Sequence, residues 1–75
     1  MKITVAAGSW ARRYMVDDSV EFTMPEHSTV ADVLKLTALP QDETGMTMIE
    51  GKNVAPEHPV TDGDVLKVYP VIIGG

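Results

Sequence analysis

One segment of this 75-residue chain has the apolar spacing of an amphipathic helix. Between Ser28 and Leu39, the residues at positions i, i+3, i+4 and i+7 form one stripe, namely Val30, Val33, Leu34 and Thr37. Thr29 is suited to cap the N-terminus, and Pro40 ends the segment. A helix of about three turns is marginal unless it packs on other structure. The sequence therefore predicts one short helix that lies on a sheet.

The other apolar segments follow the two-residue alternation of strands. This pattern is present over residues 1–5 and 20–24, and Gly8 with the polar stretch that follows favours an antiparallel hairpin with a long loop. Further strands are predicted over 45–49, over the short 53–54 and over 65–69, with turns at Glu50-Gly51 and Asp62-Gly63. The last strand is apolar on both faces, which favours a central position in the sheet.

The order strand, strand, helix, strand, short strand, strand is that of an α+β protein with a β-grasp. In that fold the first and last strands pair in parallel at the centre of a mixed four- to five-stranded sheet, and the helix crosses one face. We expect residues 1–70 to form this single domain and residues 71–75 to form a flexible C-terminal tail.

The composition excludes several kinds of site. The chain has no cysteine, so it has no disulfide framework, cysteine-ligated metal or cysteine nucleophile. A net charge of −5 argues against binding to nucleic acid. His27 and His58 lack the spacing of metal ligands, and Asp62 and Asp64 flank a turn, so no metal site is predicted. No run is long enough for a signal peptide or a spanning helix, so we expect a cytoplasmic protein that contacts no membrane.

The final residues are the most informative for function. Val71, Ile72 and Ile73 follow the last predicted strand, where exposed apolar side chains favour a binding site, and Gly74 and Gly75 follow them. Glycine lets other backbone approach closely, so this end suits a narrow channel in another protein. The terminal carboxylate is the only plausible reactive group of the chain. Adenylation by ATP would activate its acyl carbon for attack by sulfur or an amine.

Six short sequence motifs, taken in their order along the chain, resemble those of the MoaD/ThiS-type ubiquitin-like sulfur carriers. This family includes the small subunit of molybdopterin synthase and the thiazole-synthesis carrier. The resemblance covers essentially the whole chain. It rests on Met1-Lys2-Ile3-Thr4-Val5, Gly8 with Arg12-Arg13-Tyr14, Ser28-Thr29-Val30-Ala31-Asp32-Val33-Leu34, Ile49-Glu50-Gly51-Lys52, Asp62-Gly63-Asp64-Val65, and Tyr69-Pro70-Val71-Ile72-Ile73-Gly74-Gly75. Ala6-Ala7 depart from the bulkier residues usual in the molybdopterin type, and Glu50 replaces the usual turn asparagine.

The resemblance implies a carrier whose Gly75 carboxylate is adenylated and converted to a thiocarboxylate, with Gly74 beside it. The sulfur would then pass to an acceptor in cofactor biosynthesis, for which a molybdopterin or tungstopterin pathway is preferred over thiazole synthesis. The partners implied are a ubiquitin-activating-type adenylyltransferase, a sulfur donor and the large subunit of an acceptor synthase. ATP and magnesium belong to the activating partner, and this chain binds no cofactor. It is expected to be a carrier rather than an enzyme, although it could be the small subunit of a molybdopterin synthase-like enzyme.

Two further residues are candidates for partner binding. Lys67 and Tyr69 alternate with Leu66 and Val68, so they are expected on the open face of the sheet, beside the docking residues Val71, Ile72 and Ile73. Two alternatives to the sulfur carrier stay open. The activated end could form isopeptide bonds with lysines, as in a protein modifier, or the chain could be a plain interaction domain whose tail is incidental.

Overall fold

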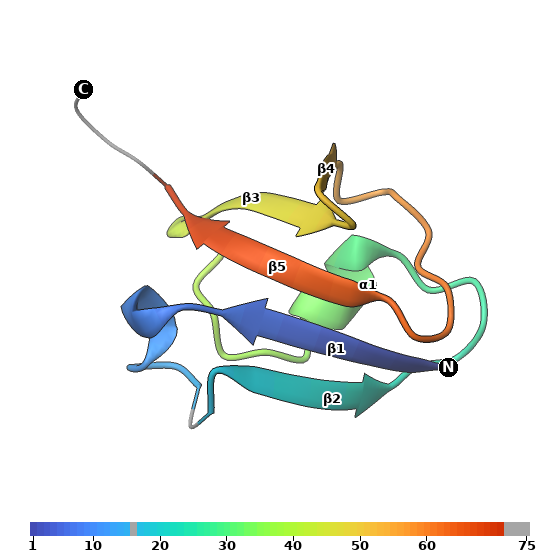
Figure 1. Cartoon of the computed structure of the whole chain (residues 1–75), viewed down its shortest axis with the longest axis horizontal. Helices are drawn as coiled ribbons and strands as arrows, with labels where there is room; N and C mark the ends of the chain where they lie inside the picture. Colours follow the sequence, from blue (N-terminus) through green and yellow to red (C-terminus); the bar gives the residue numbers. More distant parts are fainter. Residues whose placement is uncertain (16, 72–75) are drawn as a thin grey trace.

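Strand β5 (Val65–Pro70) lies at the centre of a five-stranded sheet in the computed structural model, which describes residues 1–15 and 17–71. The strand order is β2-β1-β5-β3-β4. The other strands are β1 (Lys2–Ala7), β2 (Ser19–Thr23), β3 (Thr44–Ile49) and β4 (Lys52–Val54). β1 and β5 run parallel, and the other neighbours are antiparallel (Figure 1). The predicted β-grasp and its mixed sheet are confirmed.

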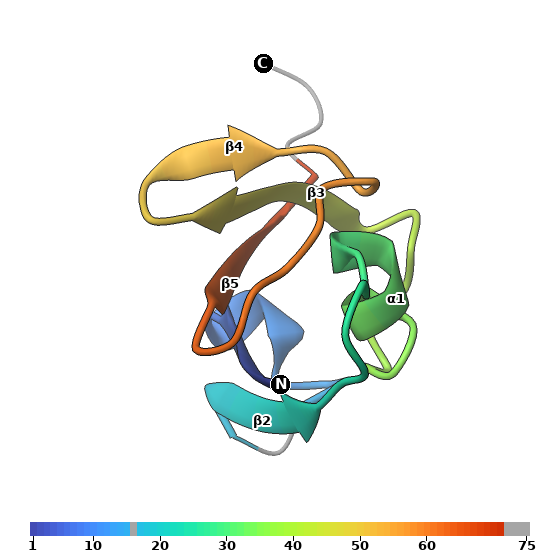
Figure 2. The same ribbon diagram turned by 90° about the vertical axis from the view of Figure 1, so that its right-hand side faces the viewer.

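Helix α1 (Val30–Leu34) lies on one side of this sheet (Figure 2). It begins at a capping box, in which the Thr29 hydroxyl accepts a hydrogen bond from the Asp32 amide and the Asp32 carboxylate accepts one from the Thr29 amide. Val30 and Val33 are fully buried against the sheet, as the helical stripe predicts. The cap and the buried stripe together fix where the helix begins and which face it buries.

The helix is shorter than the predicted segment. The next two turns are closed by i to i−3 bonds, from the Leu36 amide to the Val33 carbonyl and from the Thr37 amide to the Leu34 carbonyl. The Thr37 hydroxyl also donates to the Leu34 carbonyl at 2.7 Å. This hydroxyl occupies an acceptor at the end of the helix, so the backbone tightens there instead of continuing as an α-helix.

The core forms between α1 and the facing side of the sheet. Its largest fully buried side chains come from three segments, β1, α1 and β5: Ile3, Val5, Val30, Val33 and Leu66. The prediction that the last strand is apolar on both faces is wrong. Leu66 and Val68 are buried, but Val65, Lys67 and Tyr69, which alternate with them, are exposed. The strand is central because it has hydrogen-bonded neighbours on both sides, while one of its faces remains open.

The connection between β1 and β2 is more structured than the predicted polar loop. A short 3-10 helix, Ser9–Ala11, follows β1. Ala11 and Met15 are buried in the core, and Trp10 packs against it. The hairpin itself is antiparallel as predicted, but its connection contributes to the core because apolar residues are interspersed among the arginines and aspartates.

Candidate functional site

The candidate site lies where β5 ends. Lys67 is exposed, and Tyr69 and Val71 retain 42% and 41% of their accessible surface. The Val71 amide donates a hydrogen bond to the Glu43 carbonyl at 2.9 Å. The remaining predicted site residues, Ile72, Ile73, Gly74 and Gly75, lie outside the described residues. The structure therefore places Lys67 and Tyr69 on β5 and Val71 directly after it, and the base of the tail, Pro70 and Val71, lies beside Glu43.

Gly45 makes the close approach between β3 and the end of β5 possible. A Cβ atom at this position would stand 2.7 Å from the Pro70 carbonyl oxygen and 3.0 Å from the Val71 nitrogen. Thr44 pairs with Pro70, and the register of the two strands shifts between Thr44 and Thr47. An irregularity of this kind, with glycine at the contact, lets two backbones approach more closely than side chains allow.

Tyr14 links the segment between β1 and β2 to Glu43. Its hydroxyl donates a hydrogen bond to the Glu43 carboxylate at 2.7 Å. This bond, with smaller contributions from desolvation and the negative charge of Glu43, raises the pKa of Tyr14 above its ordinary value. Glu43 thus holds the Val71 amide with its backbone and the Tyr14 hydroxyl with its side chain.

The open face of the sheet beside the tail carries a shallow recess of about 420 Å³. The strand register places Ala6 and Met48 on either side of Lys67. The recess extends from Ala6 along β5 to Tyr69, and Trp10 and Arg12 also line it. Ala6 contributes only a small side chain to the wall of this recess.

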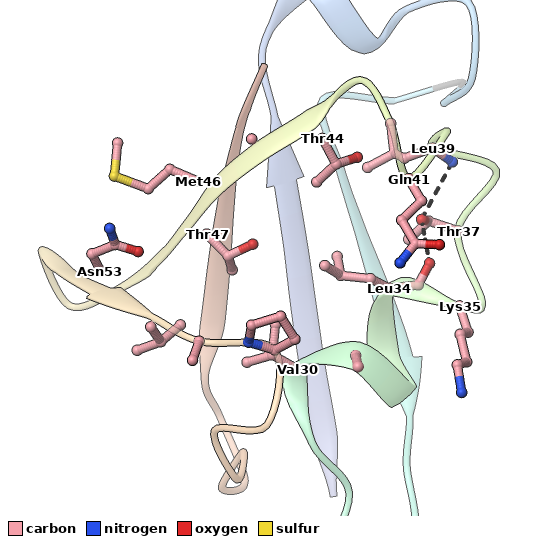
Figure 3. Close-up of a pocket in the computed structure, with 15 residues that line it drawn as sticks. Val30, Leu34, Lys35, Thr37, Leu39, Gln41, Thr44, Met46, Thr47 and Asn53 are labelled. Atoms are coloured by element: carbon pink, nitrogen blue, oxygen red, sulfur yellow. Dashed lines mark hydrogen bonds between the residues drawn. The ribbon is translucent and has the colours of Figure 1, made fainter. Parts of the chain in front are cut away.

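A larger cavity of about 880 Å³ lies on the other side of β3, between α1 and the β3–β4 pair (Figure 3). Its apolar lining includes Val30, Leu34, Leu39 and Met46. Its wall includes Gly45 but none of Lys67, Tyr69 and Val71, so it is separate from the recess on the open face.

Three features at the base of the tail were missed by sequence reasoning: Trp10, Glu43 and Gly45. A glycine within a strand signals close approach of another backbone, and Gly45 could have been recognised on that ground. Trp10 and Glu43 carried no comparable signal, because their partners are 58 and 29 residues away in the chain. Arg12-Arg13-Tyr14 was singled out for its resemblance alone, and the structure adds a contact for Tyr14.

Within residues 1–15 and 17–71, no three side chains of His, Cys, Asp or Glu are placed to hold a metal ion. No helix in that same part of the chain has the length and apolar character needed to cross a membrane.

The parallel pairing of β1 and β5, the crossing helix and the strand order define a ubiquitin-like protein with a β-grasp fold. The chain belongs to the Mut7-C ubiquitin family, whose model matches residues 11–73. No curated protein sequence matches it.

Solved structures with this fold match over nearly the whole chain. SAMP1 from Haloferax volcanii has a TM-score of 0.79 and 17% identity, and the match covers 100% of each chain. A protein from Pyrococcus furiosus, named provisionally as molybdopterin converting factor, subunit 1, has a TM-score of 0.78 and 23% identity, covering 96% of this chain and 99% of the other. A second structure, of small archaeal modifier protein 1 from H. volcanii, has a TM-score of 0.78 and 14% identity, covering 95% and 98%. The ubiquitin-like recognition made from the sequence is confirmed.

Proposed function

We propose that this protein is a sulfur carrier whose Gly75 carboxylate is adenylated and thiocarboxylated, and which then donates sulfur in cofactor biosynthesis. The observation that carries the proposal is the position of the central strand β5. It exposes Lys67 and Tyr69 on the open face of the sheet and ends directly before Val71. Membership of a ubiquitin-like family supports it. The similarity in fold to a protein named for molybdopterin conversion favours a molybdopterin or tungstopterin pathway.

The chemistry requires little from the carrier itself. A carboxylate oxygen of Gly75 attacks the α-phosphorus of ATP, and pyrophosphate leaves. A sulfur atom supplied by the donor at the oxidation level of sulfide then attacks the acyl carbon, and AMP leaves with one of the original carboxylate oxygens. The resulting thiocarboxylate is an anionic sulfur nucleophile, as a cysteine thiolate is. Its sulfur attacks an electrophilic carbon of the acceptor and displaces a leaving group there, which joins carrier and acceptor as a thioester. Water then cleaves the acyl–sulfur bond, so the sulfur stays on the acceptor and the Gly75 carboxylate is restored. ATP and magnesium are bound by the activating partner.

The open face provides a docking surface for the ubiquitin-activating-type enzyme and for the large subunit of the acceptor synthase. Tyr69 presents an exposed aromatic ring, and aromatic residues are among the commonest anchors of interfaces. Lys67 lies beside it on the same face, between Ala6 and Met48. In this proposal Val71, Ile72 and Ile73 continue the contact into the partner, and Gly74 allows the end to enter a narrow channel.

A charging reaction tests the proposal. The chain is incubated with the adenylating enzyme of its own organism, ATP, Mg²⁺ and a sulfide source, and is then treated with iodoacetamide. Because the chain has no cysteine, rapid alkylation at neutral pH reports a thiocarboxylate. We expect one alkyl adduct on the wild-type chain and none after deletion of Gly75 or addition of one alanine after it. Charging of the two altered chains would contradict the proposal.

A second candidate is a protein modifier, which would use the same adenylate to form an isopeptide bond with a lysine. It is favoured by the similarity in fold to a protein named small archaeal modifier protein 1 over nearly the whole chain. Epitope-tagged chain expressed in its own cells distinguishes the two. A modifier gives slowly migrating conjugates that vanish on deletion of Gly75, whereas a carrier gives only the free chain and its thiocarboxylate.

A further inference from the structure

The base of the tail is held by contacts that the proposed chemistry does not use. We propose that Gly45 and Glu43, with Tyr14 bracing Glu43, are positioning residues that fix where the tail leaves the sheet. The inference rests on the proposed function, because its consequence is the delivery of the Gly75 carboxylate to a partner. It concerns the path of the backbone at Pro70 and Val71, whereas docking involves the side chains of the open face.

The contact at Gly45 is steric and involves backbone on both sides. The atoms that an added Cβ would meet within 3.0 Å are the carbonyl oxygen and carbon of Pro70 and the nitrogen of Val71. A flexible side chain could rotate away from such a clash, but these atoms can move only if the end of β5 moves. The distance of 2.7 Å lies several tenths of an ångström below ordinary contact, which begins at 3.4 Å. An alanine at position 45 therefore displaces the base of the tail.

The contact at Glu43 is a hydrogen-bonded restraint. Its carbonyl accepts the Val71 amide at 2.9 Å, and its carboxylate accepts the Tyr14 hydroxyl at 2.7 Å. The Thr44 amide, next in sequence, donates to the Pro40 carbonyl at 3.1 Å, so the segment is also anchored on its other side. Val71 is thereby bonded to a segment whose position is set by two separate parts of the chain.

The position of Val71 matters because the proposed reactive carboxylate belongs to Gly75, four residues further along the chain. Four extended residues span at most about 14 Å, which limits how far from Val71 a channel can receive the carboxylate. When the open face is docked, the place where Val71 leaves the sheet decides whether the carboxylate reaches the α-phosphorus of ATP. A misplacement of about 1 Å between reacting groups can reduce a rate about 100-fold. The place where Val71 leaves the sheet therefore affects the rate of adenylation and contributes little to the affinity of docking.

The test combines a structural readout with kinetics. In Gly45→Ala we expect the Val71 amide to exchange with solvent faster than in wild type, while the Leu66 amide in the core stays protected. Gly8→Ala is the matched control for this exchange experiment, because its added Cβ comes no closer than 3.8 Å to the nearest atom. Protection of the Leu66 amide in both variants shows that the fold is intact.

With the adenylating enzyme and ATP, we expect Gly45→Ala to lower kcat about tenfold while KM for the carrier changes less than about twofold. Tyr14→Phe keeps the ring and removes only the bracing hydroxyl, so it lowers kcat about two- to threefold. Equal kcat values for wild type and Gly45→Ala, with the Val71 amide exposed, would overturn the positioning role. Absence of any charging of the wild-type chain is a different result, which would overturn the proposed function and the positioning role with it.

Discussion

The indole N–H of Trp10 donates a hydrogen bond to the carbonyl oxygen of Val68 at 3.3 Å. This bond joins the β1–β2 connection to the central strand, 58 residues further along the chain. Both residues line the recess on the open face, although Val68 is only 2% exposed. The connection thus helps to hold the central strand β5 in place.

Replacing the indole tests this role. Trp10→Phe keeps an aromatic ring against the core but removes the donor, so we expect the free energy of unfolding to fall by about 1 kcal/mol. For a domain of this size the melting temperature should fall by about 4–8 °C per kcal/mol. Urea unfolding and calorimetry measure both quantities. A variant as stable as wild type would show that the bond contributes nothing.

The capping box of α1 predicts a dependence of stability on pH. Hydrogen bonds with the backbone and the side chain of Thr29 lower the pKa of Asp32 below its ordinary value of 3.8. The backbone bond is the larger cause. A lowered folded pKa means that the stabilisation is present above pH 3.8 and is lost as the pH falls through the folded value. We expect the free energy of unfolding to fall less between pH 6 and pH 2 in Asp32→Asn than in wild type. The remaining fall is due to the other carboxylates. An unchanged difference between the two pH values would contradict this role.

The same capping box predicts the cost of losing the hydroxyl. Thr29→Ala removes the side-chain acceptor for the Asp32 amide, and such N-cap changes cost about 1 kcal/mol. Thr61→Ala is a suitable control, because Thr61 is exposed and its recorded contacts to Asp64 involve only its backbone. Urea unfolding of the two variants at pH 7 should separate them by about that amount. Equal stabilities would show that the cap does not support the helix.

Docking through the open face is tested by removing its exposed aromatic ring. We expect Tyr69→Ala to raise KM for the carrier at least about tenfold with the adenylating enzyme, as truncation of an aromatic anchor does at other interfaces. Leu36→Ala is the matched control, since Leu36 is exposed by 56% and lies on the helix side of the molecule. Equal KM values for the two variants would place the docking surface elsewhere.

Much of the fold could be predicted because its signals are local. The alternation at 1–5 and 20–24 and the stripe at Val30 and Val33 each depend on neighbouring residues, and the structure confirms them. The turn at Glu50-Gly51 is also local, and both residues adopt positive φ there. The extent of α1 was overestimated because the Thr37 hydroxyl competes for a backbone acceptor, which apolar spacing does not reveal.

The candidate site was predictable only in part. Lys67 and Tyr69 could be placed on the open face by alternation, and Val71 by its position after the last predicted strand. The contacts of Gly45 with Pro70 and of Glu43 with Tyr14 depend on which strands pair and where their register shifts, and a single sequence does not contain that information. Whether the Gly75 carboxylate is the reactive group stays a prediction.

The intact mass of the protein isolated from its own cells tests that claim most directly. The account predicts a chain ending at Gly75, of which a fraction is heavier by about 16 Da, the difference between sulfur and oxygen, and takes up one alkyl group from iodoacetamide. If every molecule instead continues beyond Gly75, or if the chain ends there but is never heavier and never alkylated even when its pathway is active, the account is contradicted.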